Sequence, residues 1–242
     1  MPSVPCVLLA EDSPVNALVI AKQLDTLGFA CTIAENGEQA WAALQAGTPF
    51  VALLTDCDMP VLDGYSLAQR VRADAGLARL PIIALSARPD AAQQARCRAA
   101  GMDDCLPKPV SNAALAGALS ARAVVAGDGD EAVDDLDALK RVFPDPRALS
   151  DLFAQFVQCA RVDLDALERA HAAGTIVAFA KLLHRFAGSL QMLNQRELAD
   201  ELEWWRRTGR LPTSAEYTQL RGQLVSVIER VRSRIDPAAG PR

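Results

Sequence analysis

The sequence predicts two domains of different fold class: a doubly wound α/β domain with a five-stranded parallel sheet over residues 1–125, and an all-α helical bundle over residues 133–242. In the first half, short apolar runs alternate with longer helical patterns, as in a parallel sheet with helices on both faces. In the second half, only helical periodicities occur. An acidic segment punctuated by glycine separates the halves and predicts a linker at residues 126–132.

Five apolar runs predict the strands of the first domain. Three continuous runs bounded by polar turns predict buried parallel strands at 6–10, 51–55 and 81–85. Weaker runs predict strands at 30–34 and 104–106. The helical patterns that alternate with them cover residues 14–27, 37–46, 64–74, 89–100 and 111–125.

The second half predicts helices joined by short turns. Their expected ranges are 133–142, 146–172, 176–193, 195–208 and 213–235. Turns fall at Pro144–Pro146, at Ala173-Gly174 and at Thr208-Gly209. Short connections between amphipathic helices make neighbours antiparallel, so we expect a bundle.

Composition excludes several classes of protein. A net charge of −5 argues against nucleic-acid binding, and no apolar run approaches the roughly 20 residues of a membrane helix. Two histidines rule out a histidine-rich metal site. The six cysteines are scattered without a C-x-x-C pair, which is typical of a reducing compartment, and we expect a cytoplasmic protein.

Polar side chains gather where the predicted strands end. Ligands of a doubly wound sheet bind at the carboxyl ends of its strands. The residues at those ends are Glu11, Asp12, Asp56, Asp58, Ser86 and Lys108. Clustered carboxylates favour a hard divalent cation such as Mg²⁺. An amine and a hydroxyl beside them favour a phosphoryl group, and a carboxylate nucleophile would form an acyl phosphate.

Residues 6–122 resemble the receiver domain of response regulators. The resemblance rests on Glu11-Asp12, the run D-C-D-M-P-V-L-D-G at residues 56–64, Ser86-Ala87 and Lys108-Pro109. It implies that Asp56 is the phosphoacceptor, and that Ser86 and Lys108 hold phosphoryl oxygens. It also implies Mg²⁺ bound by Asp12, Asp56 and the backbone carbonyl of Asp58, with Glu11 acting through water. A cis Lys108-Pro109 bond is implied as well. Cys105 departs from the family, which usually has an aromatic residue there, and this puts the aromatic switch in doubt.

One histidine of the second domain has an unusual setting. His184 lies roughly 140° around its helix from the apolar stripe and is therefore predicted to face solvent. Gly188 follows one turn later, at a mid-helix cost of about 1 kcal/mol, and would leave room for an incoming domain. Lys181 and Arg185 add positive charge. A solvated surface histidine is the alternative. His171, near a helix end, is expected to be a surface residue or a favourable C-terminal charge.

Residues 133–235 resemble a histidine phosphotransfer (HPt) domain. The resemblance rests on Leu183-His184-Arg185-Phe186 followed by Gly188-Ser189, with support from Leu198 and Leu202-Glu203 downstream and from the helix around 152–156 upstream. It implies phosphotransfer through His184, with Lys181, Arg185, Gly188 and Gln191 as its neighbours. Ala187 departs from the family, where a lysine commonly assists the phosphoryl group.

Together the two resemblances imply a bacterial two-component phosphorelay. Asp56 would accept a phosphoryl group from an upstream histidine kinase and exchange it with His184 or a partner, and a downstream response regulator receiver would take it next. The receiver would catalyse its own Mg²⁺-dependent phosphorylation and dephosphorylation, and no kinase domain is visible. The chain resembles the C-terminal half of hybrid sensor kinases, or could be free-standing, as a monomer or weak dimer. Two alternatives remain: a phosphorylation-gated binding module, or a phosphate sink with a degenerate HPt domain.

Overall fold

The computed structural model describes residues 4–87, 90–120, 139–140 and 142–235. The chain splits into two compact units, Met1–Asp134 and Asp135–Arg242, and each is described here by itself. The predicted linker at 126–132 and most of the predicted helix at 133–142 lie outside the described residues.

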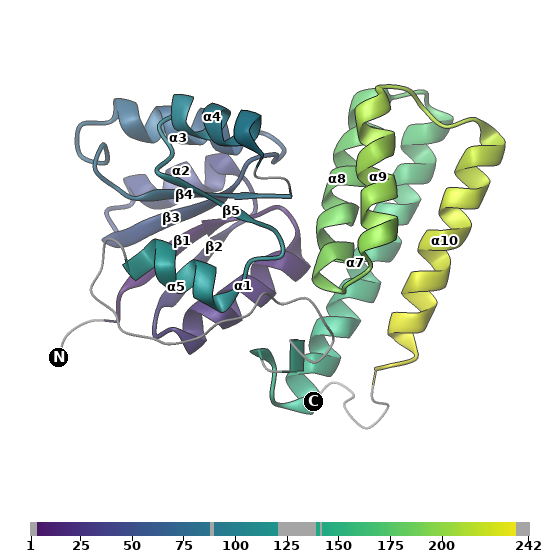
Figure 1. The fold of residues 1–242 in the computed structure, drawn as a ribbon, viewed down its shortest axis with the longest axis horizontal. Coiled ribbons are helices and arrows are strands. Elements are labelled where there is room, and N and C mark those ends of the chain that lie inside the picture. The colour runs from purple at the N-terminus through teal and green to yellow at the C-terminus, as the bar shows by residue number, and fades with distance from the viewer. Residues whose placement is uncertain (1–3, 88–89, 121–138, 141, 236–242) are drawn as a thin grey trace. The chain divides into compact units, whose positions relative to one another are not determined.

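The N-terminal unit contains a five-stranded sheet in the order β2-β1-β3-β4-β5, with every pairing parallel (Figure 1). The strands are β1 (Cys6–Ala10), β2 (Ala30–Ala34), β3 (Phe50–Asp56), β4 (Ile82–Ser86) and β5 (Asp104–Pro107). The predicted doubly wound sheet is therefore confirmed. Asp56 and Ser86 are the last residues of β3 and β4, whereas the sequence predicted that they lie just beyond these strands.

Five helices cover both faces of this sheet, α1 and α5 on one side and α2, α3 and α4 on the other (Figure 1). They are α1 (Pro14–Thr26), α2 (Gly37–Gln45), α3 (Gly64–Ala73), α4 (Ala91–Ala99) and α5 (Asn112–Ser120). Four of them begin after a side chain that caps a backbone N–H of the first turn. These caps are Ser13, Asn36, Asp63 and Asp90. Capping satisfies N–H groups that have no partner inside the helix, and so fixes where each helix begins.

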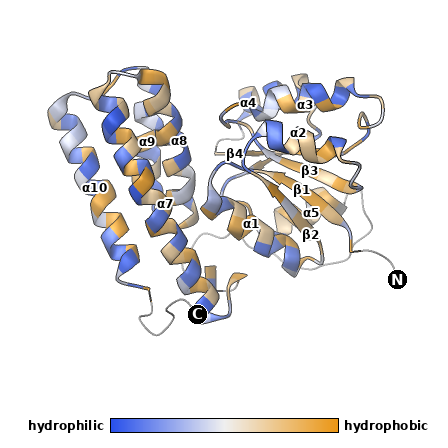
Figure 2. Cartoon of the chain, turned by 180° about the vertical axis from the view of Figure 1, so that it is seen from behind, coloured by the Kyte–Doolittle hydropathy of each residue, from blue (hydrophilic) through white to orange (hydrophobic). Residues whose placement is uncertain are grey.

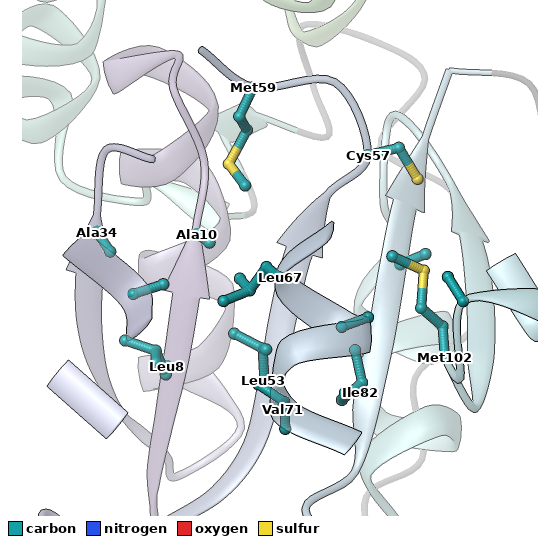
Figure 3. Packing of buried hydrophobic residues seen from close by; sticks show 14 of the residues in the cluster. Leu8, Ala10, Ala34, Leu53, Cys57, Met59, Leu67, Val71, Ile82 and Met102 are labelled. Carbon is teal, nitrogen blue, oxygen red and sulfur yellow. The ribbon is translucent and has the colours of Figure 1, made fainter. Parts of the chain in front are cut away.

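The core of this unit is built on the central strands, which are the most apolar part of the sheet (Figure 2). Leu8, Leu53 and Ile82 come from three neighbouring strands and are completely buried. Figure 3 shows them beside Leu67 and Val71 of α3. Burying each such side chain contributes about 1.5–3 kcal/mol, so the core fixes the strand ends that carry the polar residues.

The C-terminal unit is helical. Its long helices are α7 (Pro146–Ala172), α8 (Ile176–Met192), α9 (Arg196–Thr208) and α10 (Ser214–Arg232). Helix α8 packs against α7 and α9, and α10 packs against α7. The apolar stripe of α8 forms the core of this unit, where Leu183, Phe186 and Leu190 are at most 1% exposed. The predicted all-α second half is confirmed for the described residues.

His171 lies in the last turn of α7, as expected, but it is half-buried and makes specific contacts. Its ring stacks on Tyr217 at 4.2 Å, and its Nε2 atom lies 2.8 Å from the Pro212 carbonyl oxygen. The end of α7 meets the beginning of α10 here, which sequence spacing alone does not reveal. Within the part of the chain that the structure describes, no helix is both long and apolar enough to span a bilayer.

Candidate functional site

Three carboxylates meet at the carboxyl-terminal edge of the sheet. Glu11 and Asp12 directly follow β1, and Asp56 ends β3, the neighbouring strand. One oxygen from each lies within 4.8 Å of the others. Glu11 and Asp56 are at most 3% exposed, so water screens their mutual repulsion poorly. The structure thus brings together the acidic residues predicted from the strand ends.

Lys108 supplies the positive charge that this acidic cluster needs. Its Nζ atom lies 2.7 Å from both Glu11 Oε2 and Asp56 Oδ2. Burial favours the neutral amine, but attraction to Asp56 and Glu11 outweighs it and raises the pKa of Lys108 above its usual value. Burial also raises the pKa of Glu11, although Lys108 opposes that change. The lysine is therefore a fixed, charged bridge between the first and third strands.

The remaining predicted residues of this site lie around Asp56. Ser86 is buried at the end of β4, and its carbonyl oxygen accepts a 2.7 Å hydrogen bond from the Lys108 backbone N–H. The Asp58 side chain is exposed, and its backbone N–H donates to Asp56 Oδ1 at 3.4 Å. The Lys108-Pro109 bond is cis, as the resemblance implied.

Gly64 holds the loop after β3 close to the phosphoacceptor position. Its backbone N–H donates to the Cys57 carbonyl oxygen at 3.1 Å. A Cβ atom at this position would overlap the carbonyl oxygen of Asp56. Only glycine therefore fits this close approach of two backbone segments.

Cys105 occupies the position where an aromatic side chain was expected from the family. It is half-buried on β5 and packs against the hydrophobic cluster that includes Cys97 of α4. Cys97 Sγ in turn lies 4.0 Å from Cys57 Sγ. Burial raises the pKa of all three thiols, as is typical of structural cysteines.

His184 is less exposed than its position on the helical wheel predicted. Only 13% of its side chain is accessible, and its Nδ1 atom lies 2.7 Å from Glu203 Oε1 of α9. The ring is therefore partly rather than fully accessible, because α9 packs along this side of α8. Periodicity located the apolar stripe of α8, but it contained no information about a second neighbouring helix.

Glu203 is a site residue that the sequence argument did not assign. It is 3% exposed, and its second oxygen accepts a 2.7 Å hydrogen bond from Arg206 Nε. Burial opposes its ionisation, but His184 and Arg206 outweigh burial and lower the pKa of Glu203 to about 2. The sequence did contain a signal, because Leu202-Glu203 is part of the resemblance to an HPt domain, but that resemblance gave Glu203 no contact with His184.

The predicted neighbours of His184 have different surroundings. Lys181 is exposed, whereas Gly188 and Gln191 are half-buried. Arg185 donates from Nε to Asp163 Oδ2 of α7 at 3.1 Å, so this cation pairs with a buried carboxylate. Ala187 is 1% exposed, which means that a lysine here would have to bury its ammonium or distort the helix.

Comparison with known proteins defines the class of the N-terminal unit. Residues 7–120 match the family model of the response regulator receiver domain, and this part of the chain is a receiver domain. Its relatives are hybrid sensor kinases. The virulence sensor protein BvgS of Bordetella pertussis is 30% identical over 215 residues, covering 80% of this chain and 17% of that protein.

Two further relatives show the same relationship. The sensor protein EvgS of Escherichia coli is 30% identical over 194 residues, which cover 79% of this chain and 16% of EvgS. The sensor histidine kinase RcsC of Escherichia coli is 40% identical over 105 residues, which cover 43% of this chain and 11% of RcsC. The chain therefore spans only a small part of the relatives' length.

Among solved structures, the receiver domain of the Pseudomonas aeruginosa sensor histidine kinase PA1611 is 39% identical, with a magnesium ion coordinated in its active-site cleft. The match covers 50% of this chain and 98% of that one, with a TM-score of 0.47. The helical C-terminal unit of the present chain fits an HPt domain.

Proposed function

We propose that this chain is a phosphorelay intermediate in which Asp56 accepts a phosphoryl group from a histidine kinase and exchanges it with His184 or with a partner protein. The receiver domain and its likeness to hybrid sensor kinases are consistent with phosphorelay signalling. The observation that carries the residue assignment is the buried Lys108 ammonium, 2.7 Å from Asp56 and from Glu11. A charged amine held beside a carboxylate nucleophile is what acyl phosphate formation requires.

The acidic cluster fits Mg²⁺. Three carboxylates from adjoining strand ends, each with an oxygen within 4.8 Å of the others, form an oxygen donor set of the kind a hard divalent cation prefers. Asp12, Asp56 and the backbone carbonyl of Asp58 would hold the ion, with Glu11 acting through water. When bound, it would neutralise charge on the phosphoryl oxygens.

The protein residues would then perform the transfer as follows. A carboxylate oxygen of Asp56 attacks phosphorus, while the bond from phosphorus to the donor imidazole nitrogen breaks and its electron pair stays on the donor. Lys108 and the Ser86 hydroxyl contact the transferred oxygens. Because Lys108 keeps its charge when buried, it can stabilise negative charge without reorganisation. Hydrolysis of the acyl phosphate at the same site would reverse the modification.

His184 would be the second phosphoryl site. The helical unit fits an HPt domain, and the ring is partly accessible on the surface of α8. Lys181 is exposed one turn before it, so positive charge is available to meet the acidic cluster of a receiver. A histidine kinase upstream and a response regulator receiver downstream are the partners that this chemistry requires.

We assign residues 1–125 to the receiver, 126–132 to a linker and 133–242 to the HPt domain. Six free cysteines support a reducing compartment, which we take to be the cytoplasm.

The test is phosphorylation of the full chain with acetyl phosphate and Mg²⁺, followed by separation of acid-labile from alkali-labile phosphate. We expect acyl phosphate that disappears in Asp56→Asn, and phosphohistidine that disappears in Asp56→Asn and in His184→Gln. Asp58→Asn is the matched control, because its backbone carbonyl remains. Acyl phosphate without phosphohistidine, even with a partner receiver added, would favour the gated binding module or the phosphate sink instead.

A further inference from the structure

Two buried amide side chains of α1 connect this helix to the residues around Lys108. Asn16 is 1% exposed and Gln23 is 0% exposed. We propose that both are positioning residues of the receiver site: they hold Glu11 and the segment after Lys108 so that the ammonium bridges Glu11 and Asp56. This inference rests on the proposed function of Asp56 and deepens it.

Asn16 fixes the carboxylate that holds Lys108. Its Nδ2 atom donates to Glu11 Oε1 at 3.0 Å, while Lys108 Nζ lies 2.7 Å from Glu11 Oε2. Both oxygens of Glu11 are therefore engaged, and the glutamate is 1% exposed. A buried carboxylate that is held at both oxygens cannot rotate away from the ammonium.

Gln23 fixes the backbone that carries Lys108. Its Nε2 atom donates to the Val110 carbonyl oxygen at 2.8 Å, although the two residues are 87 positions apart in the sequence. At the other end, the Lys108 backbone N–H donates to the Ser86 carbonyl oxygen at 2.7 Å. The short segment from Lys108 to Val110 is thus tied to β4 at one end and to α1 at the other, which limits where the ammonium can lie.

The two amides lie on the same face of α1. They are seven residues apart, so they differ by roughly 20° around the helix axis and by about 10 Å along it. Val19 and Ile20, which lie between them, are completely buried. The oxygen atoms of both amides have no hydrogen-bond partner among the described residues. Packing therefore does not account for amides in this apolar surrounding, whereas their hydrogen bonds to Glu11 and Val110 do.

The hold on Lys108 matters most once Asp56 carries a phosphoryl group. The carboxylate of Asp56 loses its negative charge when it becomes an acyl phosphate. Of the two carboxylates that contact Lys108, Glu11 is then the one that keeps the ammonium near the transferred oxygens. Stabilisation of a transition state depends on charged groups that are in place beforehand, and a displacement of about 1 Å can cost about 100-fold in rate.

The surroundings of the Lys108 ammonium can be observed by NMR. The chain has four lysines, so the full-length protein labelled with ¹⁵N-lysine gives at most four Nζ signals. Lys108→Arg identifies the signal of Lys108 by its loss. We expect this signal to shift in Gln23→Met and in Asn16→Leu, because these substitutions keep the approximate size of the side chain but remove the hydrogen-bond donor.

Phosphorylation of Asp56 by acetyl phosphate and Mg²⁺ is then measured on the same variants, below the melting temperature of each. We expect the rate to fall by about tenfold or more in Gln23→Met and in Asn16→Leu. Leu24→Ala is the matched control, because Leu24 is on the same helix and completely buried but belongs to the apolar core. It should lower the melting temperature without changing the Lys108 signal or the rate.

An unchanged Lys108 signal in both amide variants overturns the positioning role, whatever the rate. A shifted signal with the wild-type rate also overturns it, because the reaction would then not depend on where the ammonium lies. Equal effects of Leu24→Ala on signal and rate overturn it as well, since a general loss of stability would explain them. A wild-type chain that never forms acyl phosphate at Asp56 contradicts the proposed relay instead, while a shifted Lys108 signal would still support the hold of the two amides on the ammonium.

Discussion

Lys108 Nζ lies 2.7 Å from Asp56 Oδ2, and each side chain is 4% exposed. Removing one partner of so deeply buried a pair leaves the other charge without compensation. We therefore expect Lys108→Met to lower the free energy of unfolding of the receiver by about 3–5 kcal/mol and to abolish phosphorylation of Asp56. Urea denaturation and acetyl phosphate labelling measure the two effects.

The surface pair of Lys22 and Asp25 provides the comparison. Its distance is also 2.7 Å, but its side chains are 40% and 70% exposed. Lys22→Met should change stability by no more than about 0.5 kcal/mol and leave labelling intact. Equal losses in both variants would contradict the importance of burial at Lys108.

The buried Glu203 predicts a pH dependence of the helical unit. Its pKa in the folded state is about 2, below the ordinary 4.5, so its ionised form stabilises the fold above about pH 4.5. That stabilisation, on the order of 3 kcal/mol, is lost as pH falls from about 4.5 towards 2. Thermal melts across this range should show a flatter profile in Glu203→Gln than in Glu201→Gln. Parallel profiles would refute the assignment.

A lysine at position 187 would not improve the phosphotransfer site. Ala187 is 1% exposed, so Ala187→Lys must bury an ammonium or move α8 against its neighbours. We expect a loss of several kcal/mol in stability and no faster phosphorylation of His184. Lys181→Ala, at an exposed position, should leave stability nearly unchanged. Faster transfer in Ala187→Lys would show that the helix accommodates the family's lysine after all.

Arg72 forms hydrogen bonds to the segments that precede β4 and β5. Its guanidinium donates to the carbonyl oxygens of Leu80 at 2.7 Å and Gly101 at 2.8 Å, and pairs with Asp103 at 2.7 Å. Arg72→Met should destabilise the receiver by about 1–3 kcal/mol, because two partly buried backbone acceptors and the Asp103 carboxylate lose their donor. Asp56 labelling should persist below the new melting temperature. Chemical denaturation of Arg72→Met and of the wild type measures this change in the free energy of unfolding.

The receiver site could be predicted from sequence because the strands fix it. Parallel strands bring their carboxyl ends to one edge, so locating β1, β3, β4 and β5 was enough to gather Glu11, Asp56, Ser86 and Lys108. The residue types at those ends then indicated phosphoryl chemistry. Strand boundaries were off by a residue because apolar runs do not mark where ladder hydrogen bonding stops.

The environment of His184 could not be predicted in the same way. Helical periodicity reports the face that a helix buries, but not which side chains of a third helix approach its flank. The contact with Glu203 depends on how α8 and α9 pack, and the pairing of Arg185 with Asp163 depends on α7. Both are relations between distant parts of the chain, without a local signature.

The glycine that follows β3 has a consequence for mutational tolerance. Gly64 touches no phosphoryl ligand, yet any side chain there would collide with the backbone oxygen of Asp56. Every single-nucleotide missense change at its codon should therefore displace the nucleophile. In an unbiased loss-of-function screen, changes at position 64 should be recovered as often as changes of the reactive aspartate itself, whereas the exposed Val61, whose φ is 67°, should accept glycine or asparagine.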